Sequence, residues 1–236
     1  MYTFHPSGYL YSPILLQHNV LHGFGTKKFD KSNLIAKYLT GHNTSLITPK
    51  QKHSTNITIA TAQNAKIINT GGEYFDGIIT KEKNIMLTVH TADCVPIIFF
   101  DPVKRVIGIS HQGWKGSLDK LAQKMVKQMV AMGSSVSTII ALIGPCIGDC
   151  CYEVYGERKH LFEQTFSCTP IFTIHQNKTY LNLLALNYHQ LVSSGLHKKN
   201  ISFFPFCTSC DSARFHSYFR EGENLKSQMI HFVQLI

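Results

Sequence analysis

Charged residues, arginine and long apolar runs are all scarce in this sequence. Charged residues make up 16% of the 236 residues and apolar residues 44%, a balance that excludes an intrinsically disordered chain. The longest apolar runs, such as residues 95–100, are too short to span a membrane and fit a buried strand. Residues 1–8 lack the basic start and apolar stretch of a secretory signal. We therefore expect a cytoplasmic protein with no membrane association.

The usual cofactor and hydrolase motifs are also missing. The sequence has no GxGxxG loop after a strand, no Walker A loop, no HExxH and no GxSxG. Dinucleotide-binding, P-loop and serine-hydrolase functions therefore lose their usual sequence support.

The net charge of +9 comes mainly from lysine, since only four of the 23 basic residues are arginine. The lysines are spread over both halves of the chain, which is typical of a solvated surface. A small anionic ligand is the next interpretation. We expect no nucleic-acid partner, and the sequence indicates no protein partner.

Seven cysteines, an odd number, are expected to be reduced thiols rather than a disulfide framework. They are Cys94, Cys146, Cys150, Cys151, Cys168, Cys207 and Cys210. Cys207 and Cys210 form a lone CxxC, without the second pair that marks a structural zinc site. Together with the cluster at 146–151 they can build a thiolate site, although a buried structural turn explains that cluster equally well.

Strand and helix patterns alternate along the chain. The apolar patterns predict strands at 85–90, 95–100, 105–110, 138–143 and 201–206, and helices at 156–166 and 183–194. The clearest helix is expected to be capped by Ser117, after a loop at 111–116, and to end near Gly133. This interleaving predicts one α/β or α+β domain rather than two.

Three potential metal ligands lie in loops or at strand ends, where binding sites are usually built. They are His53, Cys94 and His111. Two histidines and one cysteine leave the fourth position of a zinc ion open, as a catalytic zinc site requires. No two of them form a recognised short metal motif, so spacing alone leaves separate polar residues as the alternative.

Two segments supply candidates for substrate contacts. Trp114 fits either a wall for a flat ligand or a core anchor, and Lys115 fits either an anion contact or an exposed lysine. Arg214 and Arg220 flank a short aromatic stretch and can clamp a phosphate, with a surface role as the alternative.

Several motifs occur together, in a fixed order, from about His22 to the end of the chain. They are Gln51-x-His53, the segments 76–80, 92–97, 111–116, 144–148, 151–154 and 215–218, and Cys207-Thr208. This ordered set resembles the YfiH-like "laccase domain" family and is much more specific than any single motif.

The resemblance implies an α+β fold, a single αββα sandwich over residues 1–236, related to the catalytic domain of cytotoxic necrotizing factor toxins. It implies zinc held by His53, Cys94 and His111. It also implies purine nucleoside phosphorylase activity, in which adenosine, inosine, guanosine or methylthioadenosine reacts with phosphate to give the free base and ribose-1-phosphate. Adenosine deamination is implied as a second activity, for which zinc-activated water suits the chemistry.

An older label for the same family is polyphenol oxidase, a multicopper laccase. A trinuclear copper cluster requires many histidines, typically in HxH pairs, and none of the 13 histidines here is two residues from another. We therefore expect zinc rather than copper, although two histidines and a cysteine also suit a single copper ion.

The resemblance also suggests roles for the neighbouring residues. Cys94 and His111 are the expected catalytic residues, with Asp93 orienting a ligand. Lys115, Arg214 and Arg220 are expected to contact phosphate or polar substrate groups, and Trp114 and Phe215 to form pocket walls. Several family arginines are replaced, for example by Lys27, by Lys115 and in the segment 226–228. Lysine keeps the charge but lacks the bidentate fork that matches phosphate.

Two other functions remain open from the sequence. The first is a metal-free amidase or deamidase, with Cys94 as nucleophile and His111 as its base. The second is a non-catalytic zinc-binding partner protein that has kept the fold.

Overall fold

The computed structural model describes residues 2–41, 43–167 and 169–236, so Cys168 lies outside the described residues. The helices are α1 (Pro13–Leu16), α2 (Lys31–Tyr38), α3 (Ala65–Thr70), α4 (Trp114–Leu118), α5 (Leu121–Ala131), α6 (Gly156–Thr165), α7 (Leu183–Ser193) and α8 (Tyr218–Glu221), with 3-10 turns at Lys198–Asn200 and Gly222–Asn224. The strands are β1 (Thr3–His5), β2 (Tyr9–Tyr11), β3 (Val20–Gly25), β4 (Ser45–Ile47), β5 (Ile57–Ile59), β6 (Gly77–Thr80), β7 (Ile85–Thr91), β8 (Val95–Asp101), β9 (Val106–Gln112), β10 (Ile140–Ile143), β11 (Phe172–His175), β12 (Lys178–Leu181), β13 (Ile201–Phe203) and β14 (Met229–Leu235).

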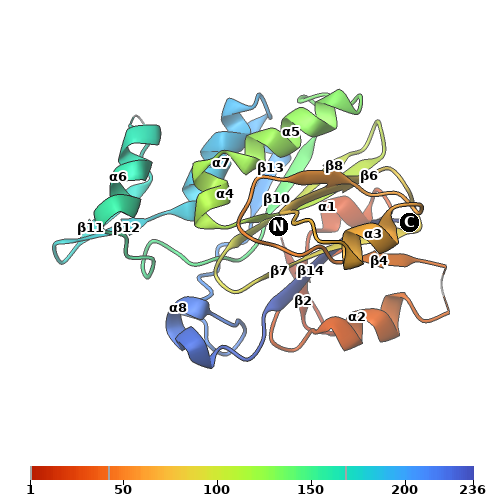
Figure 1. The fold of residues 1–236 in the computed structure, drawn as a ribbon, viewed down its shortest axis with the longest axis horizontal. Helices are drawn as coiled ribbons and strands as arrows, with labels where there is room; N and C mark the ends of the chain where they lie inside the picture. The colour runs from red at the N-terminus through yellow and green to blue at the C-terminus, as the bar shows by residue number, and fades with distance from the viewer. Residues whose placement is uncertain (1, 42, 168) are drawn as a thin grey trace.

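Within the described ranges, the strands form two six-stranded sheets and a small β11–β12 hairpin. The first sheet has the order β1-β2-β3-β14-β7-β4, and the second has the order β13-β10-β8-β9-β6-β5. The sheets stack on each other, with α4, α5 and α7 on the outer side of the second sheet and α2 on the outer side of the first (Figure 1). Helix α6 and the β11–β12 hairpin extend to one side of this sandwich (Figure 1).

The alternation of side chains along β8 explains how the second sheet covers two cores. Val95, Ile97 and Phe99 pack in the core beneath the helices, whereas Ile98 and Phe100 pack in the core between the sheets. All five side chains are fully buried. Because successive side chains of a strand point to opposite faces, a strand buried on both sides reads as a continuous apolar run.

The same alternation along β14 separates two cores in the first sheet. Val233 packs between the sheets, whereas Ile230 and Phe232 pack with Leu34 of α2 on the outer face. Three apolar cores thus separate four layers, in the order helices, sheet, sheet, helix. The predicted α+β fold and its αββα layering are confirmed.

The helix predicted to start at Ser117 is in fact two helices. Ser117 lies inside α4, where its hydroxyl accepts a hydrogen bond from Asn187 Nδ2 at 3.0 Å. Lys120 follows with a left-handed backbone (φ 61°, ψ 41°) and is the N-cap of α5. The predicted cap is therefore wrong, and Trp114 begins a helix instead of lying in a loop. Apolar spacing runs on through the break, because both helices cover the same sheet.

The other predicted elements match closely, apart from β13 at the edge of the second sheet and its neighbour β10. Strand β13 ends at Phe203 rather than at residue 206, and β10 begins at Ile140 rather than at residue 138. β10 and β13 are parallel neighbours, so their C-terminal ends lie side by side and the loops that follow them start next to each other.

Candidate metal centre

The ends of three neighbouring strands in the second sheet, β8, β9 and β6, bring together residues that are far apart in the sequence. Strands β8 and β9 are antiparallel, with Pro96 paired to His111, so Cys94 lies near His111. Strand β6 pairs with β9 on the other side, which places Asp76, just before β6, against His111. The backbone N–H of His111 donates to the Asp76 carbonyl at 2.8 Å. Strand register, a long-range property, therefore assembles the centre.

The three predicted ligands lie close enough to share one ion. The potential ligand atoms of His53, Cys94 and His111 all lie within 4.8 Å of one another. The two imidazole rings pack edge to face, with their centroids 4.8 Å apart. His111 is buried, whereas His53 and Cys94 are partly exposed, so one side of the group faces solvent. Two imidazoles and a thiolate with an accessible side fit the donor set of a catalytic metal site.

Asp76 holds both histidines in place and was missed in the sequence analysis. Its carboxylate accepts the His111 Nδ1–H at 2.7 Å and the His53 backbone N–H at 3.1 Å. Ser54 donates to the same carboxylate from its backbone N–H at 2.7 Å and from its hydroxyl at 2.6 Å. This arrangement leaves His111 Nε2 free to bind a metal. The available signal was an acidic residue directly before a strand, within a motif that matched the family.

The backbone around the centre is strained. His53 and Asp93 have positive φ angles of 58° and 91°, which non-glycine residues rarely adopt. Asp76 offsets the strain at His53, because its carboxylate binds the backbone at 53 and 54. Gly113 is required nearby, since a Cβ at that position would overlap the His53 imidazole.

The surroundings of the two histidines shift their pKa values in opposite directions. Burial by itself lowers the pKa of His111, but the neighbouring Cys94 and Asp76 outweigh burial and raise the pKa to about 9. Burial, followed by the charge of His111, lowers the pKa of His53. His53 is therefore neutral at pH 7, which is the form that binds metals.

The Asp93 carboxylate is directed at neighbouring loops rather than at a ligand side chain. It accepts the Thr208 hydroxyl at 2.6 Å, the Ser217 hydroxyl at 3.0 Å and the Phe219 backbone N–H at 2.7 Å. Asp76 orients His111, and the orienting role of Asp93 toward a ligand stays a prediction. Asp93 instead connects the turn that carries Cys94 to two C-terminal loops.

Lys115 and Trp114 follow the centre in the first turn of α4. The positive charge of Lys115 contributes to the lowered pKa of His53, so this lysine lies near the ligand group. Trp114 is partly buried against the core beneath the helices, and the Arg158 guanidinium lies over its ring, 4.6 Å from the ring centroid. One face of the indole is therefore already covered by an arginine.

Arg214, Arg220 and Phe215 make contacts of their own in the structure. Phe215 is fully buried in the core between the sheets and offers no ligand face. Arg220 donates to the carbonyls of Thr208, Ser209 and Phe215 and to the Glu221 carboxylate, so its donors are occupied. Arg214 pairs with Asp211 and stacks on Phe206. The burial of Phe215 therefore does not fit the predicted pocket wall, whereas the phosphate contacts of Arg214 and Arg220 stay a prediction.

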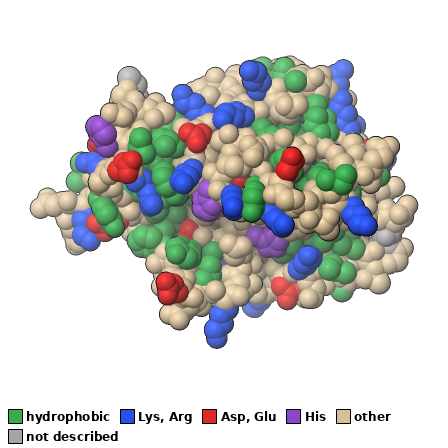
Figure 2. All heavy atoms as spheres, in the orientation of Figure 1, with side chains coloured by type: hydrophobic (Ala, Val, Ile, Leu, Met, Phe, Trp, Pro, Cys, Tyr) green, Lys and Arg blue, Asp and Glu red, His purple; other side chains and the backbone are tan. Residues whose placement is uncertain are grey.

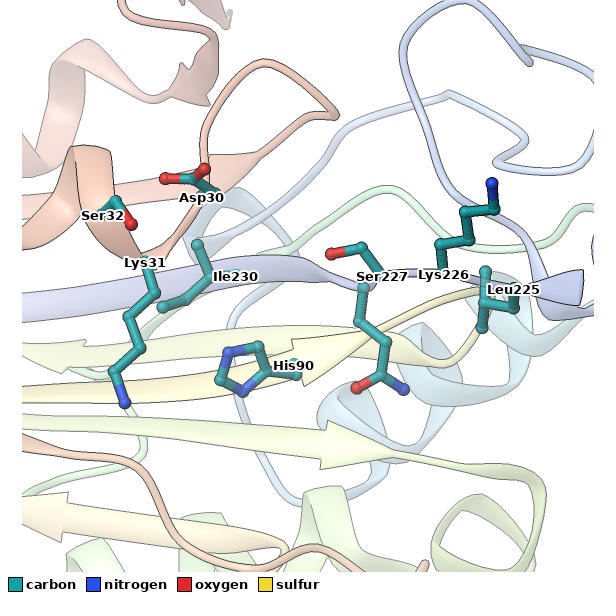
Figure 3. Close-up of a pocket in the computed structure, with 9 residues that line it drawn as sticks. Asp30, Lys31, Ser32, His90, Leu225, Lys226, Ser227 and Ile230 are labelled. Carbon is teal, nitrogen blue, oxygen red and sulfur yellow. The ribbon is translucent and has the colours of Figure 1, made fainter.

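A pocket of about 490 Å³ lies beside β7 and β14. It is lined by Asp30, Lys31, Ser32, His90, Leu225, Lys226, Ser227, Gln228 and Ile230. In Figure 3, His90 lies between Lys31 on one side and Ser227 and Lys226 on the other. On the face shown in Figure 2, histidine side chains lie near the middle with several lysines or arginines around them. The pocket thus carries positive charge beside an imidazole.

Gln51 connects this pocket to the ligand group. Its side-chain amide donates to the His90 carbonyl at 2.9 Å and accepts the His90 N–H at 2.8 Å. His53 lies two residues further along the same segment. Burial, Lys31 and His111 together lower the pKa of His90 to about 4. His90 is therefore neutral at pH 7 and can exchange hydrogen bonds without adding charge.

In the part of the chain that the structure describes, no helix has the length and apolarity to cross a membrane.

Comparisons with known proteins identify relatives of this chain. "Purine nucleoside phosphorylase YlmD" of Bacillus subtilis is 35% identical over 175 residues, which cover 72% of this chain and 62% of that protein. "Purine nucleoside phosphorylase LACC1" of Mus musculus is 35% identical over 169 residues, 69% of this chain and 39% of that protein. "Adenosine deaminase RL5", from an unknown prokaryotic organism, is 31% identical over 186 residues, 76% of this chain and 71% of that protein. The chain thus spans less than two thirds of the length of the first two relatives.

A solved structure and a family profile cover more of the chain. The crystal structure of the Bacillus licheniformis hypothetical protein YfiH superimposes with a TM-score of 0.86 at 28% identity, over 100% of this chain and 99% of that one. Residues 30–235 match the family described as multi-copper polyphenol oxidoreductase laccase. The chain is thus similar to YfiH and YlmD. It belongs to this laccase-domain family.

Proposed function

We propose that this protein is a zinc-dependent purine nucleoside phosphorylase with adenosine deaminase activity. The observation that carries the proposal is the convergence of His53, Cys94 and His111, with Asp76 binding the His111 Nδ1–H. The names of the relatives, phosphorylase for two of them and deaminase for the third, support the same substrate class. The substrates are adenosine, inosine, guanosine and methylthioadenosine, with phosphate as the second substrate.

The donor set favours zinc over the copper of the family description. Two imidazoles and one thiolate suit a zinc ion with an open position, which supplies a Lewis acid and a water of lowered pKa. A trinuclear copper cluster needs many more imidazoles. Among the described histidines, only His53 and His111 belong to a group with the spacing of metal ligands.

The chain itself supplies the charges that a phosphate requires. Lys31 and Lys226 line the pocket beside His90, and Lys115 lies close to His53. We assign phosphate binding to these lysines instead of to Arg214 and Arg220. In phosphorolysis, such cations hold and orient the attacking phosphate. His90, neutral at pH 7, can hydrogen-bond a nucleoside hydroxyl or base edge.

We further propose that residues 1–236 work as one domain in a reducing compartment, the cytoplasm. Strands β1 and β14, from opposite ends of the chain, belong to the same sheet. A thiolate ligand such as Cys94 also requires reducing conditions, because oxidation would remove it as a donor.

One observation supports a second candidate, a metal-free cysteine amidase or deamidase. The Cys94 thiol lies within 4.8 Å of the His111 imidazole, and Asp76 orients that imidazole. Nucleophile, base and orienting carboxylate are the parts of a cysteine-hydrolase triad. The strained His53, whose imidazole lies in the same group, has no role in such a triad and favours the metal.

The deciding experiment is product analysis with adenosine, with and without phosphate, on protein of measured zinc content. We expect adenine and ribose-1-phosphate only when phosphate is present, with some inosine in either case, and loss of all products in Cys94→Ala. Asp101→Asn, which changes a carboxylate at the other end of β8, is the control and should keep activity.

Three other outcomes would overturn the proposal. Inosine alone would make the protein a deaminase without phosphorylase activity. Phosphorolysis that survives complete metal removal would exclude the metal-dependent mechanism. If zinc-loaded protein forms no product from any purine nucleoside, the amidase or the non-catalytic zinc-binding protein is favoured. Rapid alkylation of Cys94 in metal-free protein would then select the amidase.

A further inference from the structure

Four cysteines lie together on two loops at the edge of the second sheet. The loops follow β10 and β13, which are parallel neighbours in the sheet (Figure 1). A parallel bridge between Cys146 and Cys207 continues this pairing beyond the strands. Cys150 and Cys151 come from the first loop, and Cys207 and Cys210 from the second.

The four thiols have the spacing of a metal site. Their sulfur atoms all lie within 4.8 Å of one another. The Cys210 sulfur is 3.5 Å from that of Cys150 and 3.3 Å from that of Cys151. Tetrahedral zinc with bonds of about 2.3 Å places its sulfur ligands about 3.8 Å apart. A disulfide requires about 2.05 Å, so the observed arrangement corresponds to a tetrathiolate set instead.

The backbone around Cys207 provides a donor to its sulfur. The Gly148 N–H donates to Cys207 Sγ at 3.2 Å. Donors of this kind stabilise a thiolate and orient it toward a metal. A Cβ at Gly148 would lie 3.1 Å from the Cys150 sulfur and 3.3 Å from the Cys207 Cβ, so glycine permits the close approach of the loops.

We propose that Cys150, Cys151, Cys207 and Cys210 bind a second, structural zinc ion, separate from the group of His53, Cys94 and His111. All four positions of a tetrahedral ion would be filled by sulfur, which leaves no open position for chemistry. Binding releases the thiol protons to solvent. Cys150 and Cys210 are exposed, so an ion can reach the site.

The structure also indicates what the second ion would stabilise. Thr208, next to Cys207, donates its hydroxyl to the Asp93 carboxylate at 2.6 Å. Ile147, in the other loop, donates its backbone N–H to the Asp93 carbonyl at 2.9 Å. Both loops therefore hold the strained turn that carries Cys94. A metal that clamps the loops together would maintain the position of that ligand.

Metal analysis of the reduced, purified protein tests the proposal directly. We expect two zinc ions per chain in the wild type and one in Cys210→Ser. Cys146→Ala removes a buried thiol of the same loop that is not part of the four and should keep two ions. Cys94→Ala should keep one ion, held by the four cysteines, whatever the activity of the protein. Failure of the proposed function would therefore leave this count unchanged.

Cobalt substitution in the Cys94→Ala background provides a second readout that does not depend on whether Cys210→Ser folds. Four thiolates should give strong sulfur-to-cobalt charge-transfer absorption and the visible bands of tetrahedral cobalt. A single zinc ion in the wild type that disappears in Cys94→Ala would overturn the proposal. Thiol counts showing a disulfide between Cys210 and Cys150 or Cys151 in protein purified without reductant, with no second ion after reduction, would also overturn it.

Discussion

At the residue scale, Asp76 joins both histidines of the candidate centre through one carboxylate. Burial alone would raise the pKa of Asp76, but hydrogen bonds from His111 and Ser54 outweigh burial and lower it. The carboxylate is therefore charged at pH 7 and keeps the His111 proton on Nδ1. The sequence identified the histidines through the family resemblance, but a carboxylate 35 residues from His111 has no local pattern that marks it.

Asp76→Asn should weaken metal binding about 10–100-fold, the usual effect of losing a carboxylate that orients a metal-binding histidine. The amide no longer fixes the charge and tautomer of His111, although its shape is similar. Competition with a chelator of known affinity measures the change. Asp101→Asn should leave metal affinity unaltered, and an unaltered affinity in Asp76→Asn itself would refute the orienting role.

Gly113→Ala tests how closely the backbone approaches His53. The added methyl overlaps the imidazole, so the ring must move away from Cys94 and His111. We expect weaker metal binding with little loss of stability. Gly72→Ala is the matched control, because a Cβ there meets nothing within 4 Å. Equal metal affinities for the two variants would show that His53 tolerates the methyl group.

At the element scale, the break between α4 and α5 shows where apolar periodicity misleads. The spacing predicts a continuous helix, yet Lys120 adopts a left-handed conformation between two helices. The break aims α4 at α7, where the Ser117 carbonyl accepts from Gln190 Nε2 at 2.6 Å. Periodicity reports which face is buried, but it does not report whether the backbone is continuous.

Lys120→Gly should stabilise the protein by up to about 1 kcal/mol, because glycine adopts the left-handed conformation without a steric penalty. Lys127→Gly, at an exposed position inside α5, should destabilise it by about 1 kcal/mol. Urea denaturation measures both free energies of unfolding. A loss of stability in Lys120→Gly as large as in Lys127→Gly would mean that the break carries no strain.

At the scale of the whole molecule, buried neutral histidines make stability depend on pH. His22 is fully buried, accepts the Ser12 N–H at 3.0 Å and is hydrogen-bonded to the Val20 carbonyl. Burial lowers its pKa from 6.5 to about 4. His231, also fully buried, has a pKa lowered in the same direction by burial, followed by the charges of His90 and His111.

The contribution of neutral His22 to stability should therefore be complete above pH 6.5 and should fall as the pH decreases toward 4. In that window the unfolded chain takes up a proton at His22 that the folded chain excludes. At about 1.4 kcal/mol per pKa unit, His22 accounts for a loss of about 3 kcal/mol by pH 4. Unfolding measured across this range should show a shallower slope in His22→Gln. His175→Gln, at an exposed position, should retain the wild-type slope, and equal slopes in all three proteins would contradict the assignment.

The sequence by itself determined the layers and the chemical character of this protein. The continuous apolar run of β8 marks a sheet buried on both sides, and ordered motifs indicate the family and its candidate ligands through residue types alone. Only the tertiary structure decided which side chains meet. Strand register placed Asp76 on His111, parallel loops gathered four cysteines, and core packing removed Phe215 from the site. Spacing along a chain is local, whereas these contacts depend on pairings between distant strands.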